Sequence, residues 1–203
     1  TVEAGAGVVA SGSTTDVEAG NTVSVVFTDS ATSTTDVTVT ASVDGSGNWT
    51  AAGADISLLN EGSVSVSASV VDDAANSAGD STTITLDMTD PATPTVNGPV
   101  PTNLAPIPTI TNPAMEIDGT FDETDTDVLT VNVNGTTYTL GVDSELTSTT
   151  GTTATWTLDL TNQAASLQAA AGGAGGVLPV DVIVTAADVA GNTATDTSTA
   201  ELI

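Results

Sequence analysis

The stretch VSVSASVVDDAANSAGDSTTITL, from Val64 to Leu86, decides the fold of this chain. Its apolar residues alternate with serine before the polar segment DDAAN, and threonine alternates with Ile84 and Leu86 after it. Alternation with a period of two is typical of a β-strand that buries one face. The polar segment supplies the turn residues that separate two such strands. The stretch therefore predicts two antiparallel strands joined by a short acidic turn.

The same pattern returns near the end of the chain, as VDVIVTAADVAGNTATDTSTAELI from Val180 to Ile203. Trp49 and Trp156 lie 107 positions apart, and Asn76 and Asn192 lie 116 apart. An insertion near residues 164–176, rich in Ala and Gly, accounts for the difference. Self-similarity at a period of roughly 90 to 110 residues predicts two copies of one domain, of a length that suits an immunoglobulin-like sandwich.

Further alternating runs support an all-β fold. They are rich in valine and threonine, whose β-branched side chains favour strands over helices. We expect two tandem immunoglobulin-like Greek-key β-sandwiches, residues 1–90 and 91–203, with a short hairpin at Asn134-Gly135. The strongest helix candidate is Ala164 to Ala171, which equally suits a loop. The runs begin at these residues: Val23, Val37, Val64, Ile84, Leu129, Trp156 and Val180.

Prolines mark the boundary between the two copies. Seven of them lie between Pro91 and Pro113. Proline cannot donate a hydrogen bond to a β-ladder, so this segment predicts a linker followed by an edge strand. Fixed φ angles at so many positions indicate a semi-rigid spacer.

The charge composition excludes several classes of function. The chain of 203 residues has no Lys, Arg, His or Cys and has 26 Asp and Glu, giving a net charge of −26. Without basic residues we expect no nucleic-acid partner. No apolar run reaches the length of about 18 residues needed for a membrane span, so we expect no membrane insertion. Hydrophobic residues form 39% of the chain, which favours a folded protein over an acidic disordered tail.

The same composition argues against an enzyme. Catalytic thiols and imidazole bases are excluded, because the chain has neither Cys nor His. Pairs of carboxylates can hydrolyse glycosides, but such pairs arise by chance in so acidic a chain. We therefore predict no catalytic residues and no enzymatic activity.

Clusters of carboxylates instead predict a metal site. Oxygen ligands in this number, without nitrogen or sulfur donors, favour Ca²⁺ over transition metals. In a Greek-key sandwich, the loops FDETDTD and DVAGN open at the end where the linker enters, so they should converge at the domain junction. The first copy offers matching carboxylates in FTDSATSTTD and DDAAN. The alternative, that these residues only stabilise turns, stays open. The candidate ligands are Asp87, Asp90, Asp122, Glu123, Asp125, Asp188, Asp72, Asp73 and Asp29.

The order of motifs resembles the bacterial immunoglobulin-like repeats of giant surface adhesins, including the RTX-type adhesins exported by type I secretion. The resemblance rests on VDGSGNWT, on DVAGN from Asp188 to Asn192, and on the junction DMTDPATP from Asp87 to Pro94. It covers nearly the whole chain as two extender repeats. The first copy departs from the pattern, because it reads DDAAN where DxAGN is expected.

The resemblance implies a structural role at the bacterial cell surface. Tandem extender repeats of this family hold an adhesive domain away from the cell in attachment and biofilm formation, and Ca²⁺ at the domain junctions makes them rigid. Carried over by position, the implied junction ligands are Asp87, Asp90, Asp122, Glu123 and Asp188. The implied partners are neighbouring repeats of the same chain, in a secreted, extracellular monomer. The alternative is an adhesin module that binds a glycan or protein receptor directly.

Overall fold

The computed structural model describes residues 7–30, 35–97, 116–163 and 178–202. Two compact units divide the chain, Thr1–Thr89 and Asp90–Ile203. The helix candidate Ala164 to Ala171, the insertion at 164–176 and the prolines from Pro99 to Pro113 lie outside the described residues. Strands dominate both units, and the prediction of an all-β fold is confirmed.

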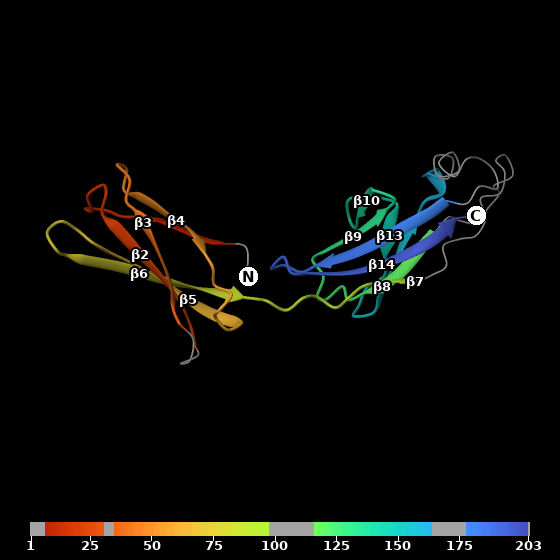
Figure 1. Cartoon of the computed structure of the whole chain (residues 1–203), viewed down its shortest axis with the longest axis horizontal. Coiled ribbons are helices and arrows are strands. Elements are labelled where there is room, and N and C mark those ends of the chain that lie inside the picture. The colour runs from red at the N-terminus through yellow and green to blue at the C-terminus, as the bar shows by residue number, and fades with distance from the viewer. Residues whose placement is uncertain (1–6, 31–34, 98–115, 164–177, 203) are drawn as a thin grey trace. The chain divides into compact units, whose positions relative to one another are not determined.

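Unit 1 contains two antiparallel sheets (Figure 1). The larger sheet has the order β3-β2-β5-β6, and the smaller one pairs β1 with β4. The side chains between the sheets include Phe27, Ile56 and Val64, each at most 1% exposed. The strands are β1 (Val8–Ser13), β2 (Thr22–Asp29), β3 (Val37–Ser42), β4 (Asn48–Ala54), β5 (Gly62–Val71) and β6 (Ser77–Leu86).

Unit 2 has two four-stranded sheets, with the orders β10-β9-β13-β14 and β11-β12-β8-β7. This is the arrangement of an immunoglobulin-like sandwich, in which strands C′CFG face strands DEBA. The strands are β7 (Thr95–Asn97), β8 (Glu116–Phe121), β9 (Val128–Val133), β10 (Thr136–Thr139), β11 (Leu146–Ser148), β12 (Ala154–Asp159), β13 (Leu178–Ala187) and β14 (Thr193–Leu202), with a 3₁₀ turn η2 (Thr161–Gln163) after β12.

The stretch from Val64 to Leu86 lies in the hairpin of β5 and β6, which pair from Gly62↔Leu86 to Val71↔Ser77. The hairpin of β9 and β10 closes through Asn134 and Gly135, whose φ angles are 50° and 86°. Positive φ at both central residues is the signature of the type I′ turn that an Asn-Gly pair favours. The sequence prediction of a hairpin at this position is confirmed.

A tryptophan packed over a glycine recurs in both units. Trp49 in β4 is opposite Gly12 in β1, and Trp156 in β12 is opposite Gly119 in β8. An added Cβ on either glycine would come within 2.6 Å of the indole ring, so the ring occupies the space that a side chain would need. Trp156 is 0% exposed and lies at the centre of its core, whereas Trp49 is only half-buried.

Candidate functional site

One end of unit 2 gathers the segments for which the sequence predicts a metal site. The β8–β9 loop reaches the start of the unit, because the amide of Ala92 donates to Asp125 Oδ2 at 3.2 Å. The same loop meets the β13–β14 end of the sandwich, where the amide of Asp127 donates to the carbonyl of Ala187 at 2.8 Å. Residues from three distant parts of unit 2 therefore lie together at this end.

Carboxylates of the β8–β9 loop bind backbone and hydroxyl donors. Asp122 Oδ1 accepts hydrogen bonds from the amide of Thr124 at 2.9 Å and from its hydroxyl at 2.6 Å. Glu123 exchanges two bonds with Gly151, which lies between β11 and β12: the amide of Gly151 donates to Glu123 Oε2 at 2.8 Å, and the amide of Glu123 donates to the carbonyl of Gly151 at 3.2 Å. These bonds fix the loop locally.

The motif DVAGN closes the β13–β14 turn. Asp188 Oδ1 accepts from the amides of Gly191 and Asn192 at 2.8 and 3.0 Å, and Asp188 Oδ2 accepts from Asn192 Nδ2 at 2.8 Å. Partial burial is the largest single influence on the pKa of Asp188 and raises it, but the hydrogen bonds from Asn192, Gly191 and Ala190 together outweigh burial, so the pKa is lowered. The motif thus holds an ionised carboxylate inside a tight turn.

Unit 1 repeats this turn with the same atoms. Asp72 Oδ1 accepts from the amide of Asn76 at 2.7 Å, and Asp72 Oδ2 accepts from Asn76 Nδ2 at 2.8 Å. The hydrogen bonds of the Asn76 side chain and amide lower the pKa of Asp72. Asp73 beside it is exposed, and its amide donates to Glu18 Oε2 at 3.2 Å. Glu18, in the β1–β2 loop, is therefore a further carboxylate at this end of unit 1, and no sequence motif marks it.

The matching of Asp29 with the β8–β9 loop is wrong. β2 pairs with β5 antiparallel, with Asp29 opposite Val64 and Ser24 opposite Ser69, so Asp29 lies at the end of the sheet away from the Asp72 turn. Asp29 is 8% exposed, and its carboxylate accepts a hydrogen bond from the amide of Asn60. The loop that corresponds to β8–β9 joins β1 to β2. Recognising Val8–Ser13 as a strand would have identified Glu18 instead.

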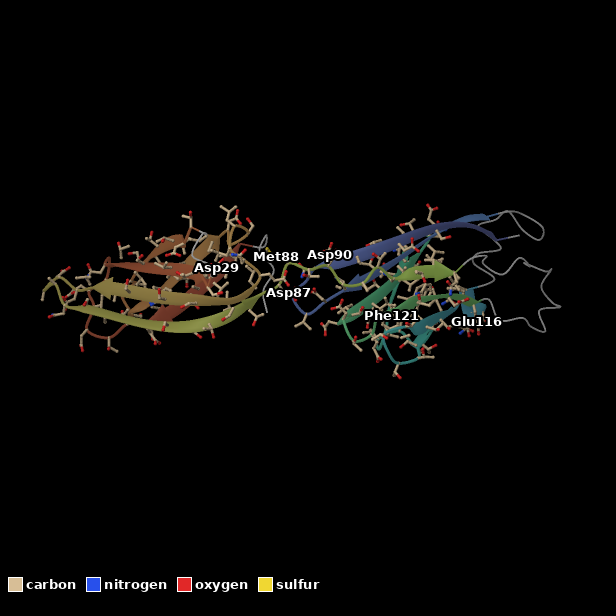
Figure 2. The ribbon with its side chains drawn as sticks, turned by 90° about the horizontal axis from the view of Figure 1, so that it is seen from below. Asp29, Asp87, Met88, Asp90, Glu116 and Phe121 are labelled. Carbon is tan, nitrogen blue, oxygen red and sulfur yellow. The ribbon has the colours of Figure 1, made fainter. Side chains whose placement is uncertain are left out.

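The two remaining candidates stand on either side of the unit boundary. Asp87 follows β6 and is half-buried, and its Oδ1 accepts from the amide of Thr89 at 3.2 Å. Asp90 is the first residue of unit 2 and is exposed. Figure 2 labels both residues, together with Asp29 at the end of β2.

The oxygen atoms at this end of unit 2 are of the kind that binds Ca²⁺. They are hard oxygens, and the hydroxyl oxygen of Thr126 in the β8–β9 loop is buried without a hydrogen-bond partner in the described parts of the chain. Nowhere in those parts do three or more acidic side chains form a group that could hold a metal ion. A Ca²⁺ ion here would therefore need carbonyl, hydroxyl or water ligands beside one or two carboxylates.

Comparisons with known proteins found similar chains among the solved structures. No protein-family model matches the chain, and no curated protein matches it. Within the described residues, no helix is long and apolar enough to span a membrane. Among solved structures, the chain is similar to a tetra-tandem repeat from the extending region of a large adhesion protein, with 25% identity, a TM-score of 0.37, and coverage of 95% of this chain and 44% of that one.

Two further solved structures are adhesins. One is a Ca²⁺-stabilised adhesin with which an Antarctic bacterium binds ice, at 25% identity and a TM-score of 0.46 over 98% of this chain and 43% of that one. The other comes from a 1.5-MDa bacterial ice-binding adhesin, at 27% identity and a TM-score of 0.42 over 100% of this chain and 61% of that one. Because these TM-scores lie below 0.5, the fold assignment rests on the strand order within each unit.

Proposed function

We propose that this chain is part of the extender region of a large secreted bacterial adhesin, and that it acts as a structural spacer without enzymatic activity. The observation that carries the proposal is the repeated sheet order, β3-β2-β5-β6 in unit 1 and β10-β9-β13-β14 in unit 2, on either side of a proline-containing link. Chains built from tandem copies of one module extend in one direction, because each copy contacts only its neighbours.

Ca²⁺ is the second part of the proposal. With a net charge of −26 and no basic side chain, the charge of the carboxylates can be neutralised by bound or screening cations but by no Lys, Arg or His. Where unit 2 begins, Asp125 already binds the amide of Ala92, so an ion held by the β8–β9 loop would also restrain the linker. One or two of the ion's ligands would come from Asp90, Asp122, Glu123, Asp125 and Asp188, and the others would be carbonyl, hydroxyl or water oxygens.

Extracellular Ca²⁺ modules bind with dissociation constants of about 10⁻⁴ to 10⁻³ M. At about 100 times the dissociation constant, one ion adds about 2.7 kcal/mol to stability. The total stability of a domain is about 5–15 kcal/mol, so one site is a large fraction of it. A chain with such sites would stay loose at cytosolic Ca²⁺ levels during type I secretion and stiffen at the cell surface, where it would project an adhesive domain in attachment or biofilm formation.

Small-angle X-ray scattering of the full chain tests this function. In millimolar Ca²⁺ we expect a narrower distribution of maximum dimensions than after EGTA treatment, with Mg²⁺ at equal ionic strength as the control for screening. The variants Asp125→Asn and Asp122→Asn should lose the Ca²⁺ response. Asp181→Asn removes the same charge from an exposed position on β13 and should keep it. Identical profiles in Ca²⁺ and EGTA would refute the role of Ca²⁺.

A further inference from the structure

A groove opens along one side of unit 1, between the edge strand β1 of the small sheet and the edge strand β6 of the large one. It has a volume of about 560 Å³ and is lined by β1 and by side chains that include Phe27, Trp49, Asp80 and Ile84. A second hollow of about 230 Å³ continues from Trp49 and Asp80 toward Val70. In the described part of unit 1, no strand pairs with the outer edge of β1.

In unit 2 the strand β7 fills the corresponding place. It pairs with β8 through Thr95↔Thr120, Val96↔Gly119 and Asn97↔Asp118, and Figure 1 shows β7 and β8 side by side. Two further hydrogen bonds hold β7. Trp156 Nε1 donates to the carbonyl of Thr95 at 3.0 Å, and the amide of Val96 donates to Asp196 Oδ2 at 2.9 Å.

Each group that holds β7 has a counterpart in unit 1. Trp49 stands opposite Gly12 as Trp156 stands opposite Gly119. In the hairpin that carries the repeated turn, Asp80 pairs with Ala68, as Asp196 pairs with Val184 of unit 2. The local bonds agree as well. Asp80 Oδ1 accepts from the amide of the following residue, Ser81, at 2.8 Å, just as Asp196 Oδ1 accepts from the amide of Thr197 at 2.9 Å.

The counterparts in the two units differ in which of their hydrogen-bonding atoms have a partner. Asp196 is half-buried and its Oδ2 binds Val96, whereas Asp80 is exposed and its Oδ2 has no partner in the described part of the chain. The indole N–H of Trp49 likewise has none there, and the ring is half-buried where Trp156 is 0% exposed. The groove thus presents an unpaired strand edge, one hydrogen-bond donor and one acceptor in the arrangement that binds β7 in unit 2.

We propose that this groove binds an extended strand of the Thr95-Val96-Asn97 pattern, supplied by the linker of a neighbouring repeat. The strand would pair with Gly12 as Val96 pairs with Gly119, its carbonyl would accept from Trp49 Nε1, and the next amide would donate to Asp80. Addition of a strand to an open sheet edge is an established mode of peptide binding. The segment Pro91–Asn97 carries no charged residue, so it can approach Asp80 and an acidic protein without repulsion.

Only the source of the strand rests on the proposed spacer function; the groove's preference for the strand is independent of it. The test uses the full chain and a capped synthetic peptide of residues Pro91–Asn97, followed by the two indole N–H signals in ¹H–¹⁵N NMR spectra. The signal of Trp49 should shift and saturate, while that of Trp156, whose N–H is already bonded, should stay in place. Trp49→Phe assigns the signals.

Two changes should each weaken peptide binding at least tenfold. One is Asp80→Ala in the protein, and the other is N-methylation of the Val96 amide in the peptide, which removes the donor for Asp80. Asp36→Ala is the matched control, because Asp36 adjoins β3 at the opposite edge of the large sheet from β6. It should bind the peptide as the wild type does.

Three results would overturn the proposal. The first is a Trp49 signal that does not move at millimolar peptide. The second is an N-methylated peptide that binds as tightly as the unmodified one. The third is a loss of peptide affinity in Asp36→Ala as large as the loss in Asp80→Ala. A shift of the Trp49 signal with protein concentration alone would assign the groove to a second copy of the chain instead of a neighbouring repeat's linker. Scattering profiles that do not respond to Ca²⁺, together with intact peptide binding, would refute the role of Ca²⁺ in the proposed spacer and leave the strand-binding groove standing.

Discussion

Gly119 lies under the indole of Trp156 and beside β7, and its replacement by alanine should destabilise unit 2 strongly. A Cβ at this position would lie 1.7 Å from the carbonyl oxygen of Thr95 and 2.6 Å from Trp156 Cε2. Trp156 is 0% exposed and has no room to move, so β7 must shift away. The shift breaks the Trp156–Thr95 bond, worth about 1 kcal/mol, and the charge-assisted bond of Val96 to Asp196, worth about 1.5–3 kcal/mol.

These losses add up to a predicted cost of about 2.5–4 kcal/mol for Gly119→Ala. Gly12→Ala in unit 1 is the matched control, because the new Cβ would also meet a tryptophan ring, at 2.6 Å from Trp49 Cζ2. Trp49 is half-buried and borders an open groove, so its ring can turn aside. Alanine also lowers the backbone entropy of the unfolded chain, so we expect a net cost of about 1 kcal/mol or less.

Thermal unfolding of the full chain, followed separately through the indole signals of Trp49 and Trp156, measures both effects. At about 4 °C per kcal/mol, Gly119→Ala should lower the melting temperature of unit 2 by about 10–16 °C, and Gly12→Ala should lower that of unit 1 by no more than about 4 °C. Equal shifts in the two variants, or a loss below about 1 kcal/mol for Gly119→Ala, would refute the reasoning that β7 is locked over this glycine.

Three further predictions concern the turns and the buried indole. Ala75 has a φ of 67° where Gly191 has 102°, so Ala75→Gly should stabilise unit 1 by about 0.5–1 kcal/mol in urea unfolding, and Gly191→Ala should destabilise unit 2. The pKa values of Asp72 and Asp188 are lowered in the folded chain, so their contribution to stability is present above about pH 4 and is lost as the pH falls through the folded pKa. In urea unfolding measured from about pH 5 to about pH 2, the free energy of unfolding of unit 2 should therefore fall less steeply with decreasing pH in Asp188→Asn than in the wild type. An equally steep fall in both proteins would count against a stabilising role of the Asp188 carboxylate in the turn. Trp156→Phe should cost about 2–3 kcal/mol through the cavity and the lost bond to Thr95, measured by urea unfolding, and a neutral effect would contradict its central place in the core.

Strong local patterns made most of the fold predictable from the sequence. Val64 to Leu86 alternates with a period of two on both sides of a polar turn, and Asn134-Gly135 has few conformations other than a type I′ turn. The strand Val8–Ser13 was missed because it is short and ends in Ser-Gly-Ser, where neither periodicity nor β-propensity is strong. That omission moved the loop assignment of unit 1 by one strand and led to Asp29 in place of Glu18.

The candidate site was less predictable, because an aspartate close to an asparagine in the sequence can either bind a metal ion or stabilise a turn through local hydrogen bonds. Asp188 and Asp72 bind the amide and side chain of an asparagine four residues later, which is a local interaction that the motif itself supplies. Sequence spacing brings the loops to one end of the sandwich, but it does not fix which oxygen atoms remain free for an ion. Ligation by Asp122, Glu123, Asp125 and Asp90 therefore stays a prediction for experiment.

The short strand β7 also has a mechanical consequence. Tension that enters unit 2 from its N-terminal side passes through Ala92 and then through the pairing of Thr95–Asn97 with β8. In the described part of unit 2, β7 is held by this pairing, by the bond from Trp156 Nε1 to Thr95 and by the bond from the Val96 amide to Asp196, whereas β13 and β14 pair along their whole length. Under fluid drag β7 would peel first and rejoin when the pull relaxes, so the module can lengthen a little and absorb a shock without unfolding its core.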